Sequence, residues 1–163
     1  MRLLPYILLG YIAVGMQVGL SGYVHLGGAA PNIVLIVAIF FALFAQKETA
    51  LISCFTLGLM QDLLTQQRLG LYALSYGLLA IVVVSTAAMV YREHPFTHAA
   101  IALAASLFTS ILLIIHGAIF GSAPGFGTSM LSAILSAFLA PAIIWGLMKL
   151  RPVLGMRIAR RWT

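Results

Sequence analysis

Residues 51–64 read LISCFTLGLMQDLL, an apolar run that carries one carboxylate, Asp62, near its end. The chain of 163 residues has only three acidic residues, and the other two are Glu48 and Glu93. An ionisable side chain is costly in a hydrocarbon environment and usually has a specific partner there. The fold and the function therefore both depend on what surrounds this run and on what Asp62 contacts.

The composition indicates that the surroundings of this run are lipid. Hydrophobic residues make up 63% of the chain and charged residues 7%, whereas ordinary soluble domains carry about 25% charged residues. A water-soluble fold of this size could not cover its surface with so few charges. We therefore predict an integral membrane protein with a single domain, residues 1–163, and no separate soluble catalytic domain.

Six apolar segments are long enough to be membrane spans, since a hydrocarbon core of about 30 Å requires roughly 20 helical residues. We predict an all-α integral membrane fold of six transmembrane helices in a compact bundle. A tight turn at Lys47 and Glu48 joins the second and third helices. The first segment follows Arg2 as a signal peptide would, but we expect a retained helix because no small-residue cleavage site ends it. The predicted helices are residues 3–20, 32–45, 49–64, 71–91, 97–120 and 129–150, followed by a basic tail, residues 151–163.

The basic residues predict the orientation. With a cytoplasmic N-terminus, eight of the nine basic residues lie inside and Arg68 alone lies outside, a strong positive-inside bias. An even number of helices also returns the basic tail to the cytoplasm. We therefore expect a multi-pass membrane protein with both termini cytoplasmic; the resemblance described below implies that the membrane is the bacterial inner membrane. The eight inner residues are Arg2, Lys47, Arg92, Lys149, Arg151, Arg157, Arg160 and Arg161.

Asp62 is the main candidate for a functional residue. It lies near a helix C-terminus, where the helix dipole disfavours an anion, so a nearby group must compensate. Arg68 could fold back to pair with it. Three interpretations stay open: Asp62 caps the turn at residues 66–70, it contacts a partner protein together with Gly58 one helical turn earlier, or it binds an ion or substrate.

Other polar and small residues give weaker signals. Gly15 and Gly19 form a G-x-x-x-G pair, a pattern that lets helices approach closely, and Pro141 predicts a bend in the last helix. We expect His94 and His98 to be solvated in an inner loop. Enzyme motifs are missing and the acids are too few for acid–base catalysis, so we predict no catalytic residues, metal, cofactor or nucleic-acid partner.

The spacing Gly58-x-x-x-Asp62, followed by Leu69 and Gly70, resembles the signature of MreD, a family of rod shape-determining membrane proteins. In that family a G-x-x-x-D segment ends the third span and a Leu-Gly pair opens the fourth. Pro31–Asn32 before the second helix and Pro141 in the last one agree with the resemblance. The resemblance implies a non-enzymatic scaffold of the cell-elongation complex that supports peptidoglycan synthesis.

The resemblance also implies partners and a fold. The partners are MreC, the glycosyltransferase RodA with the transpeptidase PBP2, the MreB filament indirectly, and membrane lipids. The fold resembles the substrate-binding subunits of energy-coupling-factor vitamin transporters. On this basis we expect Gly58 and Asp62 to dock the transmembrane helix of MreC.

The alternative function is that of a vitamin-binding transporter subunit. Such a subunit needs a polar or aromatic pocket at the outer side of the membrane. Four residues could contribute to one, namely Tyr23, His25, Tyr72 and Tyr76.

Overall fold

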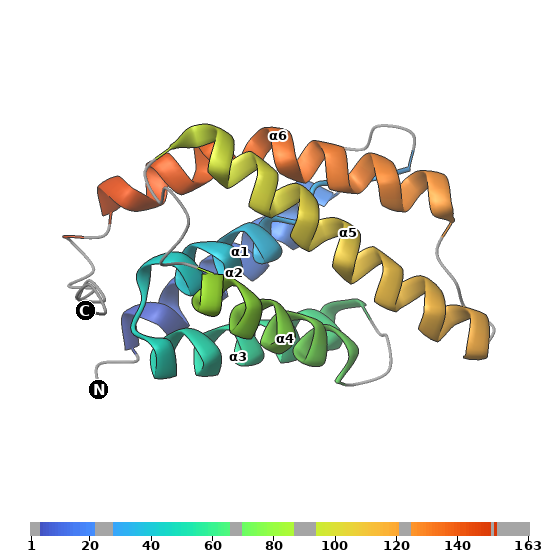
Figure 1. The fold of residues 1–163 in the computed structure, drawn as a ribbon, viewed down its shortest axis with the longest axis horizontal. Helices are drawn as coiled ribbons and strands as arrows, with labels where there is room; N and C mark the ends of the chain where they lie inside the picture. The colour runs from blue at the N-terminus through green and yellow to red at the C-terminus, as the bar shows by residue number, and fades with distance from the viewer. Residues whose placement is uncertain are drawn as a thin grey trace.

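The computed structural model describes residues 4–21, 28–65, 70–86, 94–120, 125–150 and 152. Within these residues the fold is all-helical, with six helices and no strand. Figure 1 shows their arrangement. The helices are α1 (Leu4–Ser21), α2 (Ile33–Phe44), α3 (Lys47–Thr65), α4 (Leu71–Thr86), α5 (Pro95–Phe120) and α6 (Phe126–Leu150).

The six predicted helices are therefore confirmed as helices, with ends that differ by a few residues, and their crossing of a membrane stays a prediction for α1 to α4. One difference is a correction: the turn between α2 and α3 lies at Ala45 and Gln46, and not at Lys47 and Glu48. Glu48 instead occupies the first turn of α3, where an anion interacts favourably with the positive end of the helix dipole. The predicted residues 87–91 of the fourth helix lie outside the described part of the chain.

Helix α2 occupies the centre of the molecule. All twelve of its residues are buried, and α2 contacts each of the other five helices. Its sequence, IVLIVAIFFALF, is apolar on every side, which is typical of a helix that is enclosed by others. The neighbouring aromatic rings pack at an angle to one another: Tyr6 of α1 lies 5.2 Å from Phe41, and Phe40 lies 5.2 Å from Phe44.

Four of the other five helices form two close pairs beside α2. Helices α3 and α4 pack against each other along one side, and α5 and α6 form the second pair. In Figure 1, α6 runs along the top of the view, α5 descends obliquely from it, and α3 and α4 lie along the bottom. The first residue of α1 and the last residue of α6 lie at the same end of the molecule, as six successive crossings would require.

The surface of the bundle is strongly apolar. Large side chains such as Phe138 (83% exposed), Leu4 (75%) and Tyr11 (70%) have few neighbours within the chain. By length and composition, residues 95–119 and 126–150 could each cross a membrane, and α1, α2 and α4 are shorter apolar helices. This surface suits a protein whose solvent is hydrocarbon and not water.

The central position of α2 gives a test of the fold. We expect Phe41→Ala to lower the free energy of unfolding by about 3–5 kcal/mol, because the fully buried ring leaves a cavity in addition to its lost burial. The matched control is Phe55→Ala on α3, because that ring is half exposed and leaves no enclosed void. Unfolding curves of both variants in the same detergent supply the measurement. Equal losses would contradict the central position of α2.

Candidate functional site

The Asp62 carboxylate binds the beginning of helix α4. Its Oδ2 accepts hydrogen bonds from the backbone N–H groups of Gly70 (2.9 Å) and Ala73 (3.2 Å). Its Oδ1 accepts one from the N–H of Tyr72 at 2.9 Å. Asp62 itself is fully buried, with 0% of its surface exposed. A side chain of α3 thus caps the N-terminus of the next helix.

This cap explains how a membrane protein tolerates the carboxylate. The first N–H groups of any helix lack partners within the helix, and in lipid no water replaces them. The N-terminus of α4 also carries the positive end of its helix dipole. The dipole of α3 disfavours the carboxylate at the C-terminus of that helix, whereas the dipole of α4 stabilises it at the N-terminus of the next one. Its charge and the unpaired N–H groups compensate for each other.

Gly58 lets α4 come close enough for this cap. A Cβ at Gly58 would lie 2.4 Å from Cα of Ala73 and 2.5 Å from the carbonyl oxygen of Tyr72. Both atoms belong to the backbone of α4, so no side chain can move aside to make room. Gly70 completes the arrangement with a φ of +106°, a conformation that glycine adopts without strain. We call Gly58, Asp62 and Gly70 the α3–α4 clamp.

The clamp decides among the interpretations of Asp62. The structural cap is the interpretation that the hydrogen bonds support. The expectation that Gly58 and Asp62 dock a partner's helix is wrong, because both are buried against α4 of the same chain. The physical reason is that the backbone of α4 already fills the space that Gly58 leaves. Arg68, the predicted partner of Asp62, lies outside the described residues.

Asn32 performs a similar function for helix α2. Its Oδ1 accepts a hydrogen bond from the N–H of Leu35 at 3.0 Å, which makes Asn32 the N-cap. Its own N–H donates to Ser136 Oγ of α6 at 2.8 Å, and its Nδ2 donates to the Tyr76 hydroxyl of α4 at 3.0 Å. The predicted residue Asn32 therefore connects three helices at one point.

Gln17 of α1 completes this polar network. Its Nε2 donates to the carbonyl oxygen of Pro31 at 3.1 Å, and its Oε1 accepts from the N–H of Ile33 at 2.6 Å. Ser132 of α6 donates to the carbonyl oxygen of Ala30 at 2.7 Å. The segment Ala30–Pro31–Asn32 is thus held by α1, α4 and α6, with most of its polar groups paired.

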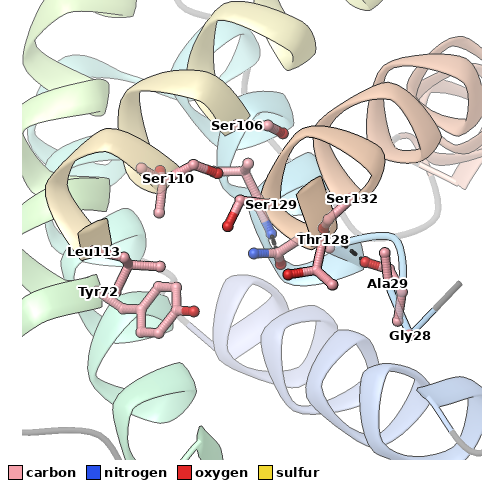
Figure 2. A pocket seen from close by; sticks show the side chains of 13 residues that line it. Gly28, Ala29, Tyr72, Ser106, Ser110, Leu113, Thr128, Ser129 and Ser132 are labelled. Atoms are coloured by element: carbon pink, nitrogen blue, oxygen red, sulfur yellow. Dashed lines mark hydrogen bonds between the residues drawn. The ribbon is translucent and has the colours of Figure 1, made fainter. Parts of the chain in front are cut away.

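A cavity of about 220 Å³ lies beside this network (Figure 2). Residues of α5 and α6 form two of its sides, and the beginnings of α2 and α4 contribute Asn32, Leu35 and Tyr72. The cavity, Asn32 and Asp62 all lie at the helix ends where α2, α4 and α6 begin, which we call the polar end. Its lining combines apolar and polar surface and includes six serine and threonine residues, namely Ser106, Thr109, Ser110, Thr128, Ser129 and Ser132.

Sequence reasoning identified part of this site and missed part of it. It singled out Asp62, Gly58 and Asn32, but not Gln17 or Thr109. Gln17 is an amide within an apolar run, and the hydroxyls of α5 and α6 recur at helical spacing, so a census of polar residues inside apolar segments would have found them.

Two further predictions have different outcomes. His98 is not solvated: it is 2% exposed and lies edge-on to Phe44, with ring centroids 6.4 Å apart. The reason is that α5 begins at Pro95, so His98 already faces the bundle. His94 is exposed and stacks on Phe96, as a solvated residue does. Helix α6 continues through Pro141, and the bend expected there stays a prediction.

Comparison with known proteins identifies the family. A sequence profile described as rod shape-determining protein MreD matches residues 1–150. The chain belongs to the MreD family. No curated protein and no solved structure matches it. MreD proteins are membrane proteins that act in rod shape determination within a shape-determining complex, which implies protein partners.

The α3–α4 clamp of this MreD protein gives a second test. We expect Gly58→Ala to lower the free energy of unfolding by about 2 kcal/mol, because the new methyl group forces two backbones apart. We expect Asp62→Ala to cost about 3 kcal/mol or more, because it leaves three buried N–H groups without an acceptor. Thermal or denaturant unfolding of the purified protein measures both values.

The double variant distinguishes a clamp from two independent contacts. Both residues let α4 pack close to α3. The double variant should therefore lose less stability than the sum of the losses of the two single variants. Gly146→Ala is the matched control, since a Cβ there meets no atom within 4 Å. Strict additivity would show that Gly58 and Asp62 stabilise the fold separately.

Proposed function

We propose that this protein is a non-enzymatic inner-membrane scaffold of the cell-elongation complex, which docks MreC and supports peptidoglycan synthesis and cell shape. The observation that carries the proposal is the family match over residues 1–150. The structure is consistent with it in one respect: the described chain consists almost entirely of helices with apolar outer faces. Among the described residues, no group of three His, Cys, Asp or Glu side chains could hold a metal ion.

The proposed orientation has six spans and both termini in the cytoplasm. The exposed residues Lys47 and Glu48 at the start of α3 then lie at the inner surface, and Lys149 near the end of α6 lies there too. The Lys149 ammonium sits 3.7 Å from the ring centroid of Trp145, a pairing typical of the membrane interface. The polar end, with its clamp and its cavity, then faces the outside.

The docking surface for MreC must lie elsewhere than on the α3–α4 clamp. Helix α1 offers the best alternative, because its Gly15 and Gly19 are exposed and a Cβ at either one would meet nothing within 4 Å. Large apolar side chains flank this open strip, among them Ile12 and Met16. In lipid, helices associate by close packing over such small residues. We therefore propose this strip as the docking site for the transmembrane helix of MreC.

The remaining partners follow from the same role. In the assembled complex the protein would contact RodA with PBP2. Its connection to the MreB filament would be indirect and on the cytoplasmic side. Membrane lipids would cover the exposed helix faces. Neither a nucleic acid nor a catalytic cofactor is part of the proposed function.

The experiment is co-purification of MreC with variants of α1. We expect Gly15→Leu and Gly19→Leu to weaken the association about tenfold, which corresponds to about 1.4 kcal/mol of lost packing. Gly146→Leu is the matched control, because that glycine of α6 also has open space beside it. If both α1 variants unfold normally and still co-purify with MreC as well as the unmodified protein does, α1 is not part of the interface.

The second candidate is a vitamin-binding subunit of an energy-coupling-factor transporter. The cavity at the polar end and the position of Tyr72 in its lining favour this function. Tyr76 does not support it, since its ring is fully buried and its hydroxyl is bonded to Asn32. The other two expected residues, Tyr23 and His25, lie outside the described part of the chain.

A vitamin screen separates the two functions. A scaffold should show no change of melting temperature with water-soluble vitamins, whereas a carrier should be stabilised by several degrees at saturating ligand. A clear shift with one vitamin would contradict the proposed scaffold function.

A further inference from the structure

The chain is strongly basic where helix α6 ends. Five of its nine basic residues lie within residues 149–163, and no acidic residue lies there. These five are Lys149, Arg151, Arg157, Arg160 and Arg161. The match to the MreD family covers residues 1–150, so membership of that family does not account for the four arginines. Such a concentration of like charge is typical of a segment that binds an anionic partner.

The last turn of α6 carries the first of these charges at the surface. Lys149 and Trp145 are both exposed, and the Lys149 ammonium lies 3.7 Å from the centroid of the Trp145 ring. A tryptophan and a basic residue near the end of an apolar helix are typical of the level of the lipid headgroups. Because Arg151 directly follows α6, the basic segment begins at this level.

The acids of this chain are too few to neutralise the segment. Asp62 is buried at the polar end, where its carboxylate binds the start of α4. The other two acids are Glu48, which follows Lys47, and Glu93, which follows Arg92. The whole chain keeps a formal charge of +6. The compensating negative charge therefore belongs to another molecule.

The residues between the arginines indicate which molecule this is. They are mostly apolar, and a second tryptophan follows the last arginine: Val153, Leu154, Met156, Ile158 and Trp162. Apolar side chains interleaved with basic ones suit a membrane surface, because the apolar groups enter the headgroup layer while the guanidinium groups bind lipid phosphates. An acidic protein surface would pair the charges but leave the apolar side chains in water. The sequence of the segment thus favours lipid.

We propose that Lys149 and the arginines of residues 151–161 bind the anionic phospholipids of the membrane surface at this end of the bundle. The segment fastens the end of α6 to that surface by charge, and Trp162 enters the headgroup layer. The inference rests on the proposed orientation only for the leaflet, which is then the inner one. It does not require the docking of MreC on α1.

The two tryptophans of the chain allow a direct test. In the variant Trp145→Phe, Trp162 is the only tryptophan, and an aromatic ring still lies beside Lys149. This full-length variant is placed in nanodiscs of phosphatidylcholine alone or of equal parts of phosphatidylcholine and phosphatidylglycerol, both with brominated acyl chains. Bromine quenches the fluorescence of a tryptophan that enters the bilayer. We expect strong quenching of Trp162 in the anionic nanodiscs and weak quenching in the neutral ones.

Salt tests the electrostatic origin of this difference. Raising the ionic strength from about 0.1 M to about 1 M shortens the Debye length from about 10 Å to about 3 Å. We expect the quenching in anionic nanodiscs to fall to the value in neutral nanodiscs. Quenching in neutral nanodiscs should stay the same, since screening of charge does not weaken apolar insertion.

Two triple variants identify the residues that bind the lipid. Arg157, Arg160 and Arg161 are all replaced, by glutamine in one variant and by lysine in the other. Each basic residue near an anionic surface strengthens association about fivefold, so the glutamine variant should lower the ratio of bound to free segment about a hundredfold. The lysine variant keeps the charge and should keep the preference for anionic nanodiscs. Lys47→Gln is the control, because Glu48 lies beside that basic residue.

Three outcomes would overturn the proposal. The first is equal quenching of Trp162 in neutral and anionic nanodiscs, and the second is absence of quenching in both. The third is a glutamine variant that loses association with MreC but shows the same lipid response as the unmodified segment, which would show that the arginines bind a protein.

These results are independent of the proposed function. Both faces of a nanodisc contain the same lipids, so the quenching does not depend on which end of the bundle is cytoplasmic, and MreC is absent from the lipid assay. Labelling of Thr163→Cys with a membrane-impermeant maleimide in intact cells tests the orientation separately. Labelling from outside would contradict the proposed orientation and leave the lipid binding measured in nanodiscs unchanged.

Discussion

Every buried N–H group at the start of a helix needs an acceptor, and in hydrocarbon no water can supply it. This constraint underlies the structure at two places. Helix α4 begins under the Asp62 carboxylate, which accepts from three of its N–H groups. Helix α2 begins at Asn32, and its first N–H groups bond to Asn32, Gln17 and Ser136. The remaining contacts assemble around these two capped ends.

The two caps also explain why the bundle has one polar end. Each cap uses at least one side chain from a different helix. The polar residues of α1, α3, α4 and α6 therefore lie at the same level of the membrane. Helix α2 can then be apolar on all sides, because its polar backbone ends are satisfied by its neighbours. The cavity lies beside this level, between the middle of α5 and the first turns of α6.

The clamp changes the functional interpretation of the family signature. A glycine and an acid spaced by one helical turn suggest a surface that receives another protein. In the folded chain this spacing receives helix α4 of the same chain instead, so the signature stabilises the contact between α3 and α4.

The sequence by itself determined the membrane class, the six helices and their approximate ends, because apolar length and the scarcity of charge are local properties. It also singled out Asp62, Gly58 and Asn32, since a polar or very small residue in an apolar run is visible without a fold. Only the tertiary structure decided which helix those residues serve, that α2 lies at the centre, and that His98 is buried. These facts depend on which helices meet, and helices with similar apolar composition can pack in many ways that one sequence does not distinguish.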